Sequence, residues 1–96
     1  VTDGNKCYII NNGCKEMSAI TGTGCMLSGI LGCFLTVENS VDSAAAAVMA
    51  MGIAGEIGAS KLKEGEGNAT LRTYLIDALF NMTDEELEKS GKYEVQ

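Results

Sequence analysis

The sequence predicts an α/β fold class, with a small edge hairpin followed by three to four helices. The first ten residues form strand-like runs around Asp-Gly, which is a strong signal for a tight hairpin turn. Two later helical runs are apolar on nearly every face and therefore need partners that bury them. Two strands cannot form a stable sheet alone, so we expect this chain to lie at the edge of a layered α/β structure.

The length and composition of the chain indicate that it is part of something larger. A chain of 96 residues is one small domain at most and has little interior. Yet 46% of its residues are hydrophobic and only 21% are charged, which is more apolar surface than so short a chain can cover. We expect residues 1–96 to be one segment of a single larger domain, or one chain of an obligate assembly, with a frayed tail at residues 91–96.

The N-terminal third predicts a hairpin, a loop and a first helix. Strands are expected at residues 1–2 and 6–10, on either side of a turn at residues 3–5. Residues 11–23 predict a loop that contains an Asn-Gly turn. A helix is expected from Gly24 to about Val37, and it should be buried because it is apolar all round.

The second helix begins after Asn39-Ser40, which is typical of an N-terminal cap. Asp42 is favourable in its first turn because the helix dipole is positive there. The helix continues through an alanine-rich stretch, and Gly65 is expected to end it. Its small residues favour a tightly packed helix pair.

A third helix and a short fourth helix complete the predicted elements. Asn68 is expected to cap the third helix, and Arg72 and Asp77 on it should be solvated. Thr83 and Glu86 form a capping-box pattern for the fourth helix, which Gly91 should stop. The buried stripe of the third helix follows a period of 3.6 residues and comprises Leu71, Tyr74, Leu75, Ala78, Leu79 and Met82.

The charge pattern argues against nucleic-acid and membrane partners. The net charge is −6, and the seven basic residues form no stripe that could contact phosphate backbones. The charge-free apolar runs, residues 25–37 and 43–55, are too short to span a bilayer. The polar start shows no signal peptide, so a cytoplasmic location is expected.

The four cysteines, Cys7, Cys14, Cys25 and Cys33, are expected to be free thiols. They contain no Cys-x-x-Cys spacing and the chain has no histidine, which disfavours a zinc site. Nothing points to secretion, which disfavours disulfides. A redox role for Cys25 would need a second thiol as partner. Cys33 lies two helical turns away, which is too far to pair easily. We expect Cys33 to be a core residue instead.

The run Gly22-Thr23-Gly24-Cys25 is the strongest candidate site, because it stands where the first apolar helix begins. The leading N–H groups of a helix have no intrahelical partner and attract anions such as phosphate. Glycines at Gly22 and Gly24 would let successive N–H groups form a concavity. A thiol in the first helical turn has its pKa lowered, so Cys25 could accept a proton beside the anion.

These residues together fit phosphoryl transfer, which depends mostly on positioning and charge stabilisation. A purely structural interpretation remains open as well. Gly-x-Gly before a helix is common, and Cys25 could be a small buried helix residue. Two known phosphate motifs are excluded. The Gly-Lys-Ser/Thr ending of a P-loop is absent, and the glycine spacing of a dinucleotide fingerprint fails.

Taken in order, the motifs of residues 1–83 resemble the hydroxyethylthiazole kinase family of the ribokinase-like superfamily. They are VTDG with its hairpin, AITGTGCMLSGILGCFLTVE, the alanine-rich helix with GIAGE, and LIDALFNMT. One motif departs from the family, whose Gly-Pro-Gly-Ser-Phe-like run is GEGNATL here, and this puts the local packing in question.

The resemblance implies that the chain is the C-terminal part of a ribokinase-like three-layer α/β/α sandwich. It implies transfer of the γ-phosphate of ATP, with Mg²⁺, to the hydroxyl of 4-methyl-5-(2-hydroxyethyl)thiazole in thiamine salvage. Gly22, Thr23, Gly24 and Cys25 would form the anion hole, Gly22 would also contact substrate, and Cys25 would be the proton acceptor. The resemblance also implies a homotrimer with active sites between subunits, and an isolated 96-residue segment without activity.

Two alternatives remain open from the sequence. One is a related kinase for hydroxymethylpyrimidine or pyridoxal, against which Thr21 and the GIAGE block favour the thiazole enzyme. The other is a non-catalytic interaction module, in which the apolar helices form a docking surface and the Gly22–Cys25 run is only a tight turn.

Overall fold

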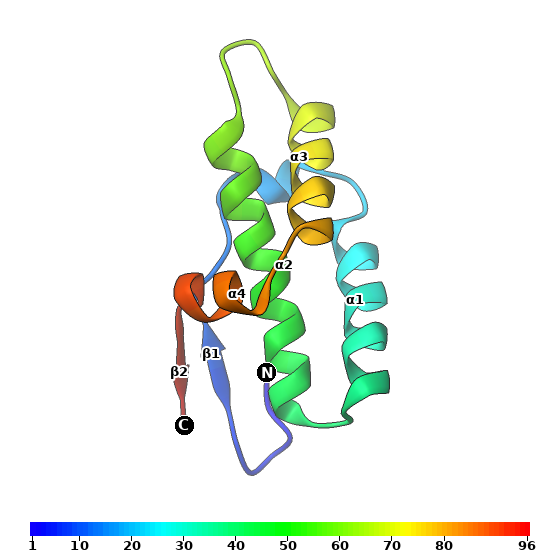
Figure 1. Cartoon of the computed structure of the whole chain (residues 1–96), viewed down its shortest axis with the longest axis vertical. Helices are drawn as coiled ribbons and strands as arrows, with labels where there is room; N and C mark the ends of the chain where they lie inside the picture. The colour runs from blue at the N-terminus through cyan, green and yellow to red at the C-terminus, as the bar shows by residue number, and fades with distance from the viewer.

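The computed structural model describes residues 1–96 as four α-helices with a small two-stranded sheet at one side (Figure 1). The long helix α2 runs through the middle, with α1 and α3 along one side and the sheet and α4 on the other. The molecule is elongated, with extents of 45 × 23 × 23 Å. The elements in order are β1 (Tyr8–Ile10), the 3₁₀ helix η1 (Lys15–Ala19), α1 (Thr23–Val37), α2 (Val41–Lys61), α3 (Asn68–Phe80), α4 (Asp84–Ser90) and β2 (Tyr93–Val95).

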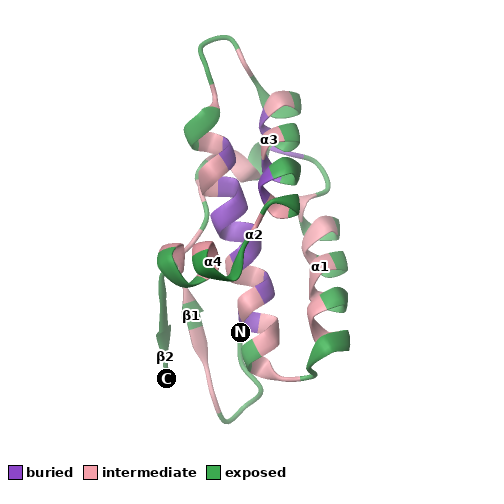
Figure 2. Ribbon diagram, viewed as in Figure 1, coloured by how far each residue is buried: buried purple, intermediate pink, exposed green.

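The core lies where α2 and α3 pack against each other, and the loop before α1 closes it (Figure 2). The predicted stripe of α3 is confirmed, because Leu71, Leu75 and Ala78 are buried while Arg72 is exposed. The core cluster comprises Ile20, Met51, Ala54, Leu71, Leu75 and Ala78. Only 13 of the 96 residues are fully buried, and seven large hydrophobic side chains are exposed.

The small residues of α2 let other segments approach its backbone, as the sequence predicted. A Cβ on Gly52 would lie 2.7 Å from the backbone oxygen of Asn12. A Cβ on Gly58 would meet α3 at 3.2 Å. Each glycine therefore permits one close approach to α2, Gly52 for the loop after β1 and Gly58 for α3.

The sheet differs from the predicted one in its second strand. The N-terminal hairpin is present but small, with a single bridge between Thr2 and Cys7 around Gly4, whose φ is +94°. β1 pairs instead with β2, antiparallel, with Tyr8 opposite Val95 and Ile10 opposite Tyr93. Within the tail expected to fray, residues 91–96, the segment Tyr93–Val95 forms strand β2 on the free edge of β1.

Helix α1 is not buried, although its apolar surface predicted burial. None of its residues is fully buried, and Val37 at its end is 88% exposed. Cys33, expected in the core, is exposed. The physical reason is that α1 packs on α2 along one side only, and no second layer covers its other faces in this chain.

The predicted helix ends agree with the structure at three positions, including Gly91 as the C-cap of α4, and differ at two. Ser40 caps α2 by accepting a hydrogen bond from the Ser43 N–H at 3.1 Å, and Thr83 caps α4 in the same way. Asn68 is not the cap of α3, because Gly67 holds that position. Helix α2 ends at Lys61, ahead of Gly65, which has a φ of +86° in the loop beyond.

By length and hydropathy alone, helix α2 could cross a membrane. Its 21 residues are more than the charge-free run of residues 43–55, which is by itself too short to span a bilayer. Half of its most apolar window is buried inside the fold, and core helices of soluble proteins meet the same criteria. These numbers give weak support for a membrane span.

Candidate active site

The Gly22–Cys25 turn forms the N-terminal end of α1 and leaves several backbone N–H groups free. Gly22 is the N-cap of α1 and has a φ of +93° and a ψ of 6°, in the left-handed region that favours glycine. Its carbonyl accepts the first helical hydrogen bond, from the Met26 N–H at 3.0 Å. The N–H groups of Thr23, Gly24 and Cys25 have no acceptor within the chain, so they remain available to a ligand.

The two glycines of the turn contribute differently. A Cβ added at either Gly22 or Gly24 would meet nothing within 4 Å, so the space above the turn is open. Gly24 has no positive φ and lies within the first turn of α1. The bend therefore comes from Gly22 alone, and Gly24 serves to keep the approach to the helix end clear.

Cys25 lies at the third position of α1, beside the free N–H groups. Its thiol is exposed, and none of the four cysteines forms a disulfide. Eight residues separate Cys25 from Cys33, which is about 12 Å of helix rise. The two thiols therefore lie too far apart for a disulfide.

Two contacts hold the chain just before the turn. The Asn68 side-chain amide, on the first turn of α3, donates to the carbonyl of Ala19 at 2.8 Å. The next residue, Ile20, is 6% exposed and belongs to the core cluster. The turn thus extends from a segment that is fixed by one polar contact and one apolar contact.

Glu56 fixes the beginning of the same loop. Its carboxylate accepts hydrogen bonds from the Gly13 N–H at 2.9 Å and from the side-chain amide of Asn12 at 3.3 Å. Asn12 in turn accepts from the Lys92 N–H at 2.6 Å and donates to the Ser90 carbonyl at 3.0 Å. This network joins α2, the loop and the segment before β2.

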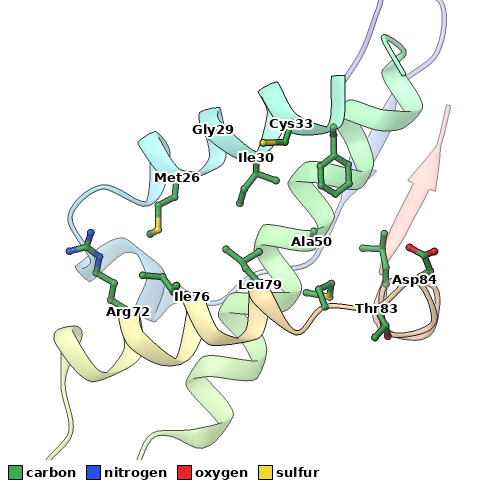
Figure 3. Close-up of a pocket in the computed structure, with 13 residues that line it drawn as sticks. Met26, Gly29, Ile30, Cys33, Ala50, Arg72, Ile76, Leu79, Thr83 and Asp84 are labelled. Atoms are coloured by element: carbon green, nitrogen blue, oxygen red, sulfur yellow. The ribbon is translucent and has the colours of Figure 1, made fainter. Parts of the chain in front are cut away.

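An apolar groove of about 790 Å³ lies between α1, α3 and α4 (Figure 3). Met26 and Ile30 point from α1 toward Ile76 and Leu79 on α3, with Arg72 at one end of the groove. Nine of its thirteen lining residues are hydrophobic, and Met26 follows directly after the turn. The groove can take an apolar group or an apolar protein surface, but it contains no residue of the turn itself.

The structure thus brings together the four candidate residues, Gly22, Thr23, Gly24 and Cys25, at one helix end. Sequence reasoning missed Asn68, which holds the chain just before this helix end, and Glu56, which holds the beginning of the loop, because both act on backbone atoms far along the chain. A signal for Glu56 existed, since the GIAGE block was noted without a physical role.

Comparison with known proteins identifies the family. The sequence model described as "Hydroxyethylthiazole kinase family" matches residues 1–85. Hydroxyethylthiazole kinase from Clostridium acetobutylicum is 38% identical over 96 residues, which cover 98% of this chain and 35% of that protein. Hydroxyethylthiazole kinase from Alkaliphilus oremlandii is 44% identical over 93 residues, which cover 96% of this chain and 34% of that protein. The chain spans about a third of the length of the curated relatives that it matches.

A solved structure supports the fold. The structure of hydroxyethylthiazole kinase protein from Pyrococcus horikoshii OT3 superposes with a TM-score of 0.89 over 99% of this chain and 36% of the other, at 24% identity. The expected α/β class is confirmed in its coarse form, as a helix-rich part of an α/β fold with a small two-stranded sheet. The family expected from the sequence is confirmed as well: this chain belongs to the hydroxyethylthiazole kinase family.

Proposed function

We propose that this chain is the C-terminal segment of an enzyme that phosphorylates the hydroxyl group of 4-methyl-5-(2-hydroxyethyl)thiazole with ATP, in thiamine salvage. The observation that carries the proposal is the N-terminal end of α1, where three successive N–H groups have no acceptor and the third of these residues, Cys25, has an exposed thiol. Membership of the kinase family supports it. The chain would supply the anion hole and the proton acceptor, and the upstream part would supply the thiazole pocket and much of the ATP contact.

Each residue of the turn has a distinct part in the proposed step. The N–H groups of Thr23, Gly24 and Cys25 stabilise the charge on the γ-phosphoryl group as it transfers. The Cys25 sulfur is the acceptor for the proton of the substrate hydroxyl. An oxygen–phosphorus bond to the thiazole alcohol forms, the bond from the γ-phosphorus to the bridging oxygen breaks, and ADP leaves. Gly22 allows the substrate to approach because it has no side chain.

The turn fits the phosphate groups of ATP, because it is open and its N–H donors are free. This segment offers no comparable site for Mg²⁺, because it contains no cluster of three His, Cys, Asp or Glu side chains that could ligate a metal ion. We propose that the ion binds with the phosphates of ATP and with side chains outside this segment. Its contribution is to neutralise phosphate charge.

We propose that the rest of the enzyme covers the apolar faces left open here. The two-stranded sheet would extend into a ribokinase-like three-layer α/β/α sandwich, in which α1 and the groove beside it face other layers. A homotrimer with active sites between subunits would cover more of this surface. Four free thiols are typical of a cytoplasmic enzyme.

The test is ATP turnover by the complete enzyme with three alcohols in competition: the hydroxyethylthiazole, hydroxymethylpyrimidine and pyridoxal. We expect the thiazole alcohol to have the highest kcat/KM. Preference for either other alcohol would favour the related vitamin-precursor kinases. Failure to bind ATP at all would leave the interaction module as the better interpretation.

A further inference from the structure

The position of the Gly22–Cys25 turn depends on how the preceding segment is held. Neither Thr21 nor Gly22 donates a hydrogen bond within the chain, and both are exposed. The last hydrogen bond from another element before the turn is the one from the Asn68 amide to the Ala19 carbonyl. Three residues span at most about 10 Å, so this contact limits where Gly22 can lie.

The contact joins two elements that are distant in the sequence. Asn68 and Ala19 lie 49 residues apart, so no local preference forms the bond. Asn68 lies on the first turn of α3, and this helix is held in place because its residues Leu71 and Leu75 are buried in the core. The Asn68 amide on α3 thus fixes the position of Ala19, in the loop before α1, relative to the core.

We propose that Asn68 is a positioning residue for the proposed phosphoryl transfer: its amide, through Ala19, fixes the Gly22–Cys25 turn at the start of α1. The inference rests on the proposed function, since it assigns a role toward the same site. Asn68 itself is not a catalytic residue, because its side chain contacts a carbonyl three residues before the turn. Misplacement of a catalytic group by about 1 Å can cost two orders of magnitude in rate.

Asn68→Asp separates this role from a general effect on stability. The substitution keeps the shape of the side chain but replaces the donor amide with a carboxylate, which cannot donate to the Ala19 carbonyl. A carboxylate in the first turn of a helix is favoured by the helix dipole, so α3 should form at least as well. The thermal unfolding midpoint of the variant is therefore expected to match or exceed that of the wild type.

Asn81→Ala is the matched control. The Asn81 amide also donates to a backbone carbonyl at 2.8 Å, that of Asp77, at the opposite end of the same helix. The two residues differ in that only the bond of Asn68 reaches the loop before the turn. Loss of the Asn81 bond should leave the kinetics unchanged.

In the complete enzyme, Asn68→Asp is expected to lower kcat by about tenfold to a hundredfold while the KM for ATP stays close to the wild-type value. Protonation of the new carboxyl group restores a donor, so the ratio of variant to wild-type kcat should rise as the pH falls toward about 4. A purely structural role predicts no such pH dependence.

Hydrogen exchange followed by mass spectrometry gives a readout that does not need kinase activity. The N–H groups of Ile20 and Met26 are hydrogen-bonded on either side of the turn. Their exchange is expected to be up to about tenfold faster in Asn68→Asp, and unchanged in Asn81→Ala.

Wild-type exchange in Asn68→Asp would overturn the inference, and so would a wild-type kcat. An equal loss of kcat in Asn81→Ala would overturn it too, because the effect would then be general. If the wild-type enzyme phosphorylated none of the alcohols, the proposed function would fail by itself, and exchange alone would decide whether Asn68 holds the turn.

Discussion

Cys25 occupies the position where a single atom decides the proposed chemistry. In the complete enzyme we expect Cys25→Ala to lower kcat strongly and to change ATP binding little, because the backbone N–H groups of the turn remain. A general base contributes typically 10²- to 10⁴-fold, so a loss of about that size is expected in steady-state kinetics. Unchanged turnover would remove Cys25 from the mechanism.

Replacement of Cys25 by a carboxylate tests whether a different proton acceptor at this position can support the reaction. We expect Cys25→Asp to keep or raise kcat, since an exposed carboxylate is ionised at neutral pH and can accept the hydroxyl proton. The measurement is kcat across neutral pH, with circular dichroism to verify folding. A folded but inactive Asp variant would argue against a proton acceptor at this position.

At the residue scale, the sequence predicted what depends on near neighbours and missed what depends on distant ones. Leu71 and Leu75 were found because helical period places them on one face. The positive φ of Gly22 followed from a glycine in front of a helix. The contacts of Asn68 and Glu56 reach residues 49 and 43 positions away, which no local pattern encodes.

Among the elements, α2 depends most on the absence of side chains. We expect Gly52→Ala to destabilise the protein by about 1–3 kcal/mol, since the new Cβ would lie 2.7 Å from the Asn12 backbone oxygen, which cannot move freely. Gly55→Ala is the comparison, because the new Cβ would meet the flexible end of Met17. A lower unfolding midpoint for Gly52→Ala than for Gly55→Ala is the expected order, and the reverse order would contradict a close backbone approach.

The start of α2 carries a pH-dependent contact with the hairpin. Asp42 accepts a hydrogen bond from Lys6 at 2.8 Å and another from the Tyr8 hydroxyl, and these contacts lower the pKa of the Asp42 carboxyl below its usual value. Because the folded pKa lies below the unfolded one, the contribution is complete above about pH 4 and is lost as the pH falls through the folded pKa. The pair is exposed, so the contribution is small.

Thermal unfolding of Asp42→Asn between pH 2 and pH 7 checks this contact. We expect the wild type to be more stable than the variant at neutral pH and the difference to disappear toward pH 2. Asp77→Asn on the exposed face of α3 serves as the control. A wild-type advantage that persisted at pH 2 would contradict an ionic origin.

The elements themselves were predictable in kind, while their partners were not. All four helices and the first hairpin follow from periodicity, caps and turn residues. Strand β2 was missed because its partner lies at the other end of the chain, although Tyr93-Glu94-Val95 alternates as a strand does. The burial of α1 was overestimated. An apolar helix surface indicates that something must cover it, but it does not indicate which segment or chain does so.

At the scale of the whole molecule, the exposed apolar surface predicts how residues 1–96 behave alone. Val37 and Phe80 are each 88% exposed, and the groove beside α1 is open. We expect this segment alone to have no kinase activity and to self-associate, because large exposed apolar patches drive association. Light scattering after size exclusion, with an ATP-turnover assay, checks both; an active or strictly monomeric segment would contradict the proposed division of the enzyme.

The pairing of β1 with β2 has a consequence for the newly made chain. Asn12 and Lys92, which meet beside the sheet, are separated by 80 residues. At about 5–20 residues per second, a ribosome needs roughly 4–16 s to make that stretch. During this interval β1 has an unpaired edge that another nascent chain can occupy. Translation speed across the helices therefore sets how long this protein is open to misassembly before its last strand closes the sheet.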